Sequence, residues 1–122
     1  MHFQTFVIID PDEISCFLAR NVVRTCFPEA GIEIYDNIPE AIGILSVKEE
    51  PCCIIIENTV LHLGVKPLLE LVKELAKRNF RVIILSNAFQ KKLLSVIPKF
   101  HHVRFTYKPI NKKKLIELIE EW

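Results

Sequence analysis

The chain has 122 residues, of which half are apolar and a quarter are charged, and its formal net charge is +1. These values indicate one globular domain over residues 1–122 and exclude a disordered chain. The nearly neutral balance gives no general signal for binding to nucleic acid or to an acidic membrane surface.

Short apolar runs alternate with segments of helical spacing from the start of the chain to its end. Apolar residues three and four positions apart predict helices over residues 14–22, 38–45, 68–75, 89–96 and 115–122. Most of the runs between them are continuously apolar, which is typical of strands buried on both faces of a parallel sheet. These predicted strands are Phe6–Ile9, Ile32–Tyr35, Cys52–Ile56, Val82–Leu85 and Val103–Tyr107.

Helix starts are marked in the sequence as well. Asn37 with Glu40 three residues later forms a capping box with Pro39 in the first turn, Asn111 is suited to cap the last helix, and Asp12 the first. A strand followed by a helix, repeated five times, predicts an α/β domain with a doubly wound five-stranded parallel sheet, a flavodoxin-like (βα)5 arrangement. Ligands of such folds bind beyond the carboxyl ends of the strands.

The cysteines and the first apolar run bear on the compartment. The four cysteines, at positions 16, 26, 52 and 53, lack the spacing of a metal site, so we expect reduced thiols, two of them inside a buried strand. The run Phe6–Ile9 ends at Asp10 and is too short for a signal sequence or a membrane span. We therefore expect a cytoplasmic protein with no membrane partner.

Polar residues follow four of the five predicted strands. Asp10 and Asp12 follow the first strand, Glu57 the third, Ser86 the fourth and Lys108 the fifth. Each of them alone is more often a helix cap, a turn residue or a solvated lysine. Because parallel strands end at the same edge of a sheet, we expect these side chains to converge there, and the combination indicates a functional site.

Around these positions the chain resembles the receiver domains of two-component response regulators. The resemblance covers nearly the whole chain and rests on the segments FVIIDPDEISCFL, PCCIIIENTVL, VIILSN and YKPINKKKLIELI. It implies that Glu57 stands at the phosphoacceptor position, that Ser86 and Lys108 contact the phosphoryl group, and that Phe105 is the aromatic switch. It also implies a cis peptide bond between Lys108 and Pro109.

The chain departs from the family where the chemistry takes place. The family ends its first strand with two acids, of which the second is the main Mg²⁺ ligand, and this place is taken by Pro11, which has no side-chain oxygen. Asp12 substitutes only if the loop shifts by one residue, which leaves Asp10 and Glu57 as the other carboxylates for a doubtful Mg²⁺. Glu57 also carries its carboxylate one methylene further out than aspartate, and such a misplacement costs on the order of 10²-fold in rate.

The departures predict a degenerate receiver, or pseudo-receiver, with little or no phosphotransfer. We expect Glu57 to place a fixed negative charge near Lys108 and Ser86 and so to hold the Ser86/Phe105 switch in one state without phosphate. The function would then be phosphorelay signalling through protein–protein interaction, and the chain would not be an enzyme.

An enzymatic alternative uses the same residues. The segment VIIDPDEI matches the first motif of haloacid-dehalogenase-type phosphatases, and VIILSN matches the second. Asp10 would be the nucleophile, Asp12 the general acid and base, Ser86 a phosphate clamp and Lys108 a charge stabiliser. The further acidic pair that such enzymes need for Mg²⁺ after a later strand is absent from this sequence, where only Lys108 follows that strand.

Charge is distributed unevenly along the chain. Residues 1–80 contain twelve acids and seven bases, whereas Arg81–Lys114 contains nine bases and no acid. Because arginines and aromatics do not interleave there, a solvated positive face is favoured over nucleic-acid binding. The resemblance implies that the face of residues 88–117 binds a histidine kinase, a phosphotransfer or output protein, or a second copy of the chain. An acidic partner surface would make this binding salt-dependent.

Overall fold

The computed structural model describes residues 3–57, 70, 80–86 and 102–122. The helices predicted over residues 68–75 and 89–96 lie, apart from Glu70, outside the described residues. All five predicted strands and the three remaining predicted helices are present.

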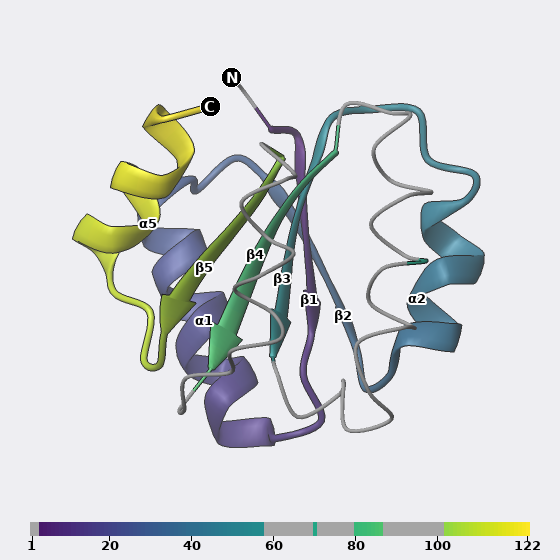
Figure 1. The fold of residues 1–122 in the computed structure, drawn as a ribbon, viewed down its shortest axis with the longest axis horizontal. Coiled ribbons are helices and arrows are strands. Elements are labelled where there is room, and N and C mark those ends of the chain that lie inside the picture. The colour runs from purple at the N-terminus through teal and green to yellow at the C-terminus, as the bar shows by residue number, and fades with distance from the viewer. Residues whose placement is uncertain (1–2, 58–69, 71–79, 87–101) are drawn as a thin grey trace.

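The strands form one parallel sheet in the order β2-β1-β3-β4-β5. This order confirms the doubly wound five-stranded sheet (Figure 1). The central strands are almost entirely buried, as their continuous apolar runs predict, whereas β2 and β5 at the two edges are partly exposed. The strands are β1 (Thr5–Ile9), β2 (Gly31–Tyr35), β3 (Cys52–Glu57), β4 (Phe80–Ser86) and β5 (Val103–Tyr107).

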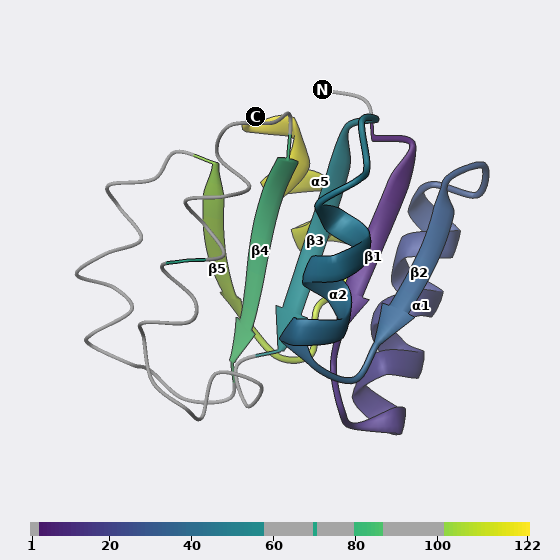
Figure 2. The same ribbon diagram turned by 90° about the vertical axis from the view of Figure 1, so that its right-hand side faces the viewer.

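Helices α1 (Glu13–Cys26) and α5 (Lys112–Glu120) cover one face of the sheet, and α2 (Ile38–Leu45) covers the other (Figures 1 and 2). Each begins at the predicted cap. The side chains of Asn37 and Asn111 accept hydrogen bonds of 2.9 Å from backbone N–H groups three residues later. Asp12 accepts from two N–H groups of the first turn of α1.

Strand alternation divides the core into two halves. On the side of α1 and α5, which we call the α1 face, β1 contributes Phe6 and Ile8. On the α2 face it contributes Val7 and Ile9. Because successive residues point to opposite faces, each strand residue can be assigned to one half. Within the described residues, no helix combines the length and apolarity that crossing a membrane requires.

The buried stripe of α1 differs from the expected one. The apolar spacing that predicts this helix runs through Ile14, Phe17, Leu18 and Val22. The first three are exposed, at 72%, 51% and 46%, whereas Val22 is partly buried against the core. The helix instead buries small residues and one valine at the spacing i, i+3, i+7, namely Cys16, Ala19 and Val23. Both sets of residues lie at helical spacing, so the apolar pattern alone does not decide which side of α1 faces the sheet.

Candidate functional site

The sheet register brings the predicted site residues to one edge, at the bottom of Figure 1. Asp10 and Glu57 become neighbours because β1 and β3 are paired in register up to the residues directly before them. Ser86 ends β4, and its carbonyl oxygen accepts a hydrogen bond of 2.9 Å from the backbone N–H of Lys108. We call this edge, formed by Asp10, Glu57, Ser86 and Lys108, the rim.

An ion pair joins two of these residues across the sheet. Nζ of Lys108 lies 3.0 Å from Oε1 of Glu57, and the two side chains are 14% and 2% exposed. Because β4 lies between β3 and β5, the lysine spans one strand to reach the carboxylate. A carboxylate this buried is strongly destabilising without an opposite charge, so the pair neutralises the centre of the rim. The peptide bond after Lys108 is cis, as the resemblance implies.

Asp10 is buried but only partly satisfied. It is 3% exposed, and its Oδ1 accepts a hydrogen bond of 2.9 Å from the backbone N–H of Asp12. Its Oδ2 has no hydrogen-bond partner within the described part of the chain. A buried carboxylate oxygen without a partner is unfavourable, because it has lost its hydration on folding.

Asp12 caps helix α1 and does not replace the acid that the family carries at the position of Pro11. Its carboxylate oxygens accept from the backbone N–H groups of Ile14, at 3.4 Å, and Ser15, at 3.3 Å. It is therefore the N-cap of α1, with the loop in unshifted register.

Strand alternation separates the predicted site residues into two groups. Asp10, Glu57 and Lys108 continue the alternation of the α1 face. Ser86 and Phe105 continue that of the α2 face, against whose core Phe105 is packed. Ser86 is fully buried, and both its hydroxyl position and the Phe105 ring thus lie on the side of the sheet away from the ion pair.

The described side chains offer few ligands for Mg²⁺. They include no group of three or more His, Cys, Asp or Glu residues placed to hold a metal ion. Pro11 offers no side-chain oxygen, Asp12 caps a helix, and Oε1 of Glu57 is paired with an ammonium group. Asp10 and Glu57 would be the carboxylates to hold the ion, and water would have to complete its octahedral coordination.

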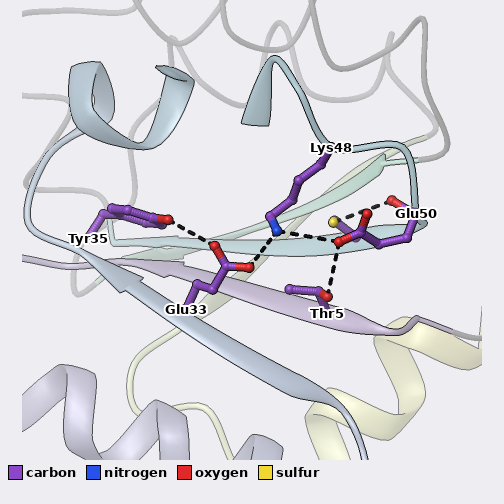
Figure 3. Close-up of polar contacts among 6 residues, drawn as sticks. Thr5, Glu33, Tyr35, Lys48 and Glu50 are labelled. Carbon is purple, nitrogen blue, oxygen red and sulfur yellow. Dashed lines mark hydrogen bonds and ion pairs between the residues drawn. The ribbon is translucent and has the colours of Figure 1, made fainter. Parts of the chain in front are cut away.

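A second polar cluster lies on the α2 face and was not predicted from the sequence (Figure 3). Lys48, after α2, forms ion pairs with Glu33 of β2 and with Glu50, and we call these three residues the flank cluster. The hydroxyl of Tyr35 donates to Glu33 at 2.9 Å, and that of Thr5 to Glu50 at 3.5 Å. The sequence offers one signal for this cluster. Glu33 is an acid inside a predicted strand, and a partly buried carboxylate needs a partner.

The pKa shifts in the flank cluster follow from these contacts. The hydrogen bond to Glu33 raises the pKa of Lys48 despite the opposing effect of burial. Burial, followed by the hydrogen bond to Glu33, raises the pKa of Tyr35. Burial also raises the pKa of Cys52, whose thiol donates to the backbone oxygen of Glu50, to about 11. The single ammonium group of Lys48 therefore faces two carboxylates, those of Glu33 and Glu50.

No family model matches the chain, and no curated protein matches its sequence. Its structure is similar to a response regulator from Thermotoga maritima, with a TM-score of 0.74 and 18% identity over 98% of this chain and 97% of the other. It is similar to the bacteriophytochrome response regulator AtBRR, with a TM-score of 0.75 and 13% identity over 99% and 93%. It is also similar to a response regulator receiver protein from Burkholderia phymatum, with a TM-score of 0.70 and 19% identity over 94% of this chain and 90% of the other.

These similarities cover almost the whole of each chain. None of the three proteins is a haloacid-dehalogenase-type phosphatase, so the comparisons give no support to the enzymatic alternative. At identities below a fifth they establish the architecture and not the chemistry. The fold of this chain is the receiver fold of response regulators.

Proposed function

We propose that residues 1–122 form a degenerate receiver domain that works in phosphorelay-type signalling through protein–protein contacts and has no catalytic activity. The observation that carries this proposal is the ion pair between Glu57 and Lys108, 3.0 Å long and with the carboxylate 2% exposed. It occupies the position where the resemblance puts the phosphoacceptor and the lysine that contacts the phosphoryl group.

Two features of the rim oppose phosphotransfer. A carboxylate oxygen that is held by an ammonium group is a weaker nucleophile, and it must leave this partner before it attacks phosphorus. The described side chains also offer few ligands for the Mg²⁺ that would offset charge in the transition state. Glu57 therefore acts as a permanent anion.

In this proposal the fixed negative charge of Glu57 takes the place of the phosphoryl group as the signal. In the family that this chain resembles, the lysine and the hydroxyl respond to a phosphoryl group, and the aromatic residue follows. The backbone N–H of Lys108 donates to the carbonyl oxygen of Ser86, so we expect a permanently paired Lys108 to hold Ser86 and Phe105 in one arrangement across the sheet. The domain would then present one surface to its partner at all times.

The partner surface that we propose includes the described end of the face of residues 88–117. Lys112 and Lys113 are exposed at the start of α5, whereas Arg104 is paired with Glu121 at 2.9 Å. An acidic protein surface would meet the unpaired lysine charges. The four cysteines are free thiols, which supports a reducing compartment such as the cytoplasm.

A gain-of-function experiment tests the absence of phosphotransfer. The wild-type chain and the double variant Pro11→Asp/Glu57→Asp are incubated with acetyl phosphate and Mg²⁺, and intact mass is measured. We expect no phosphorylated wild type and Mg²⁺-dependent phosphorylation of the double variant, in which both altered groups are restored. A Mg²⁺-dependent acyl phosphate on Glu57 of the wild type would contradict the proposal.

A second experiment tests the lock. Glu57→Gln removes the anion and keeps the shape, so the aromatic ¹³C signals of Phe105 and Tyr107, whose rings stand edge to face at 5.5 Å, are expected to change. Glu121→Gln, which breaks the exposed pair with Arg104, is the matched control and leaves them unchanged. Unchanged Phe105 signals in Glu57→Gln would show that the pair does not set the switch.

A further inference from the structure

Strand β2 lies at one margin of the sheet, where β1 is its single neighbour among the described strands (Figure 2). The hydrogen bonds that join the two strands identify the residues that face β1. The N–H of Gly31 donates to the carbonyl oxygen of Gln4 at 2.9 Å, and the N–H of Asp10 donates to the carbonyl oxygen of Tyr35 at 3.0 Å. Gly31 and Tyr35 therefore direct their backbone groups toward β1.

The alternate residues of β2 direct their backbone groups outward. Backbone groups of successive strand residues point to opposite sides, so the N–H and C=O groups of Ile32 and Ile34 point away from β1. Such an edge can pair with a further strand, and proteins usually protect it with proline or with charge. β2 contains no proline, and its one charged residue, Glu33, forms an ion pair with Lys48 of the same chain. The outer edge of β2 is therefore open to a second strand.

Apolar side chains accompany this edge on the α1 face. Ile34 is 40% exposed and lines a hollow of about 470 Å³ between β2 and α1. Phe17 is 51% exposed and lines the same hollow from the side of the helix. A strand added beside β2 would cover both side chains, so burial of apolar surface would add to the backbone hydrogen bonds.

The side of α1 that faces this hollow changes its charge along the helix. Glu13, Phe17, Arg20 and Arg24 stand at i, i+4, i+7 and i+11, so they share one side of the helix, and the first three line the hollow. Glu13 lies in the first turn of α1, beside Asp36 at the carboxyl end of β2, and Arg24 lies in the last turn. The surface beside β2 is therefore acidic at the carboxyl end of the strand and basic at its amino end.

We propose that a second copy of the chain docks on this surface, with the two β2 strands paired antiparallel about a twofold axis and the two sheets joined into one. The antiparallel arrangement lays the acidic end of one surface beside the basic end of the other, so that Asp36 of each copy approaches Arg24 of the second copy. A closed dimer requires a surface that is complementary to itself under a twofold rotation, and this charge pattern supplies it.

The charge of Glu33 determines the register of this pairing. With the axis at Glu33, the two glutamates would face each other at the closer spacing of a pair without hydrogen bonds, which is unfavourable. With the axis at Ile34, the two Ile34 residues exchange N–H and C=O hydrogen bonds across the axis. Glu33 then lies opposite Tyr35 of the second copy, a residue whose hydroxyl already donates to a glutamate within its own chain. We therefore place the axis at Ile34.

This dimer does not rest on the proposed function, because β1 separates β2 from β3 and from the ion pair of Glu57. It also uses a surface on the other side of the sheet from the face of residues 88–117, since β5 is the last strand of the order. β2 has five residues, so the interface is small. We expect a dissociation constant on the order of 100 µM.

The oligomeric state of the unmodified chain provides the first test. Sedimentation velocity from about 10 µM to about 1 mM is expected to show a shift from monomer to dimer. Amide hydrogen exchange at the two ends of this range locates the interface. We expect the N–H groups of Ile32 and Ile34 to become protected at the high concentration. Glu33, whose N–H points toward β1, is the internal reference and is expected to exchange equally at both.

Three variants test the role of the edge. Ile34→Pro removes the outward N–H, which β1 does not use, so the fold is retained and dimerisation is expected to be lost. Ile34→Lys places two ammonium groups at the axis and is expected to weaken the dimer at least about tenfold. Ile44→Lys is the matched control, because Ile44 of α2 is 39% exposed, and it leaves the dimer unchanged. The amide spectrum of each variant verifies that it is folded.

A charge exchange tests the antiparallel arrangement. Asp36→Arg and Arg24→Asp each create two repulsive contacts in the dimer, one on each side of the axis, and each is expected to weaken it about tenfold at low salt. The double variant Asp36→Arg/Arg24→Asp restores both contacts with their charges exchanged. We expect its dissociation constant to return to within about threefold of the wild-type value.

Four outcomes would overturn the dimer proposal. They are a chain that stays monomeric up to about 1 mM, protection on association that lies in α5 and not in β2, association of Ile34→Lys equal to that of the wild type, and a double charge variant as weak as the single ones. None of them changes the result of the acetyl phosphate experiment, so failure of the dimer and failure of the proposed function are distinguishable.

Discussion

The rim and the flank cluster use the same residue types in opposite ways. Lys108 at the rim and Lys48 in the flank cluster have side chains that are both 14% exposed. Their acids differ, because Glu57 is 2% exposed whereas Glu33 and Glu50 are each 33% exposed. The flank carboxylates keep part of their hydration, and the rim carboxylate keeps almost none.

The hydration of the carboxylates determines how much each ion pair contributes to the stability of the fold. The flank cluster joins β2 to the connection between α2 and β3 at a small cost in desolvation, so it is a modest stabilising contact. In the rim pair, the attraction between the two charges roughly offsets the free energy that their burial costs, so the pair is weak evidence for stability. We attribute its presence to a role at the site instead. The comparison predicts that the two lysines are far from equivalent when removed.

The largest effect is expected at the rim. Lys108→Met leaves Glu57 buried without its lysine and is expected to lower the free energy of unfolding by about 3 kcal/mol. The double variant Lys108→Met/Glu57→Gln, which removes both charges, is expected to recover most of this loss. Urea unfolding monitored by circular dichroism measures both. A double variant as unstable as Lys108→Met would show that the packing of the lysine matters and its charge does not.

A smaller effect is expected from the thiol beside the flank cluster at alkaline pH. Burial raises the pKa of Cys52 from 9.0 to about 11. The unfolded chain therefore loses this proton at lower pH than the folded chain, and the stability contributed below pH 9 is lost as the pH rises toward 11. The loss is expected to be on the order of 2 kcal/mol at pH 11. Cys52→Ala should flatten this part of the pH profile in urea unfolding, and an unchanged slope would rule out the thiol as its source.

Removing the flank lysine is expected to cost less than removing the rim lysine. Lys48→Met should lower the free energy of unfolding by about 1 kcal/mol, because the acids it leaves can recover their water. Its loss should shrink at high salt, whereas the loss for Lys108→Met should not. Equal losses for the two variants in matched urea titrations would contradict the contrast in hydration.

The smallest effect is expected from variants of Asp12, which separate the contribution of its charge from that of helix capping. Asp12→Ala removes the cap of α1 and is expected to cost about 0.5 to 1 kcal/mol, whereas Asp12→Asn keeps an acceptor and should cost a few tenths. Thermal unfolding of both variants measures the difference. If Asp12→Asn were as destabilising as Asp12→Ala, the negative charge at the rim would have a structural role of its own.

The strand-end pattern predicted which residues share one edge of the sheet, but not how they interact. Asp10, Glu57, Ser86 and Lys108 could be placed at one edge because parallel strands end together. That Lys108 spans β4 to reach Glu57, and that Asp10 keeps an unsatisfied oxygen, depends on side-chain positions that no spacing encodes. The flank cluster escaped prediction because its members are up to 17 residues apart and meet only when β2 packs beside the α2–β3 connection.

Neighbouring residues were enough to predict the five strands, the three described helices and their caps, because backbone periodicity and capping are local properties. Which side of α1 is buried depended instead on contacts with segments remote in the sequence. Both Ile14, Phe17 and Leu18 and the smaller Cys16, Ala19 and Val23 lie at helical spacing, and hydrophobicity favours the first set. The second set is buried in a core cluster with residues of the strands and of α5, because packing depends on side-chain volume against a surface that remote segments form.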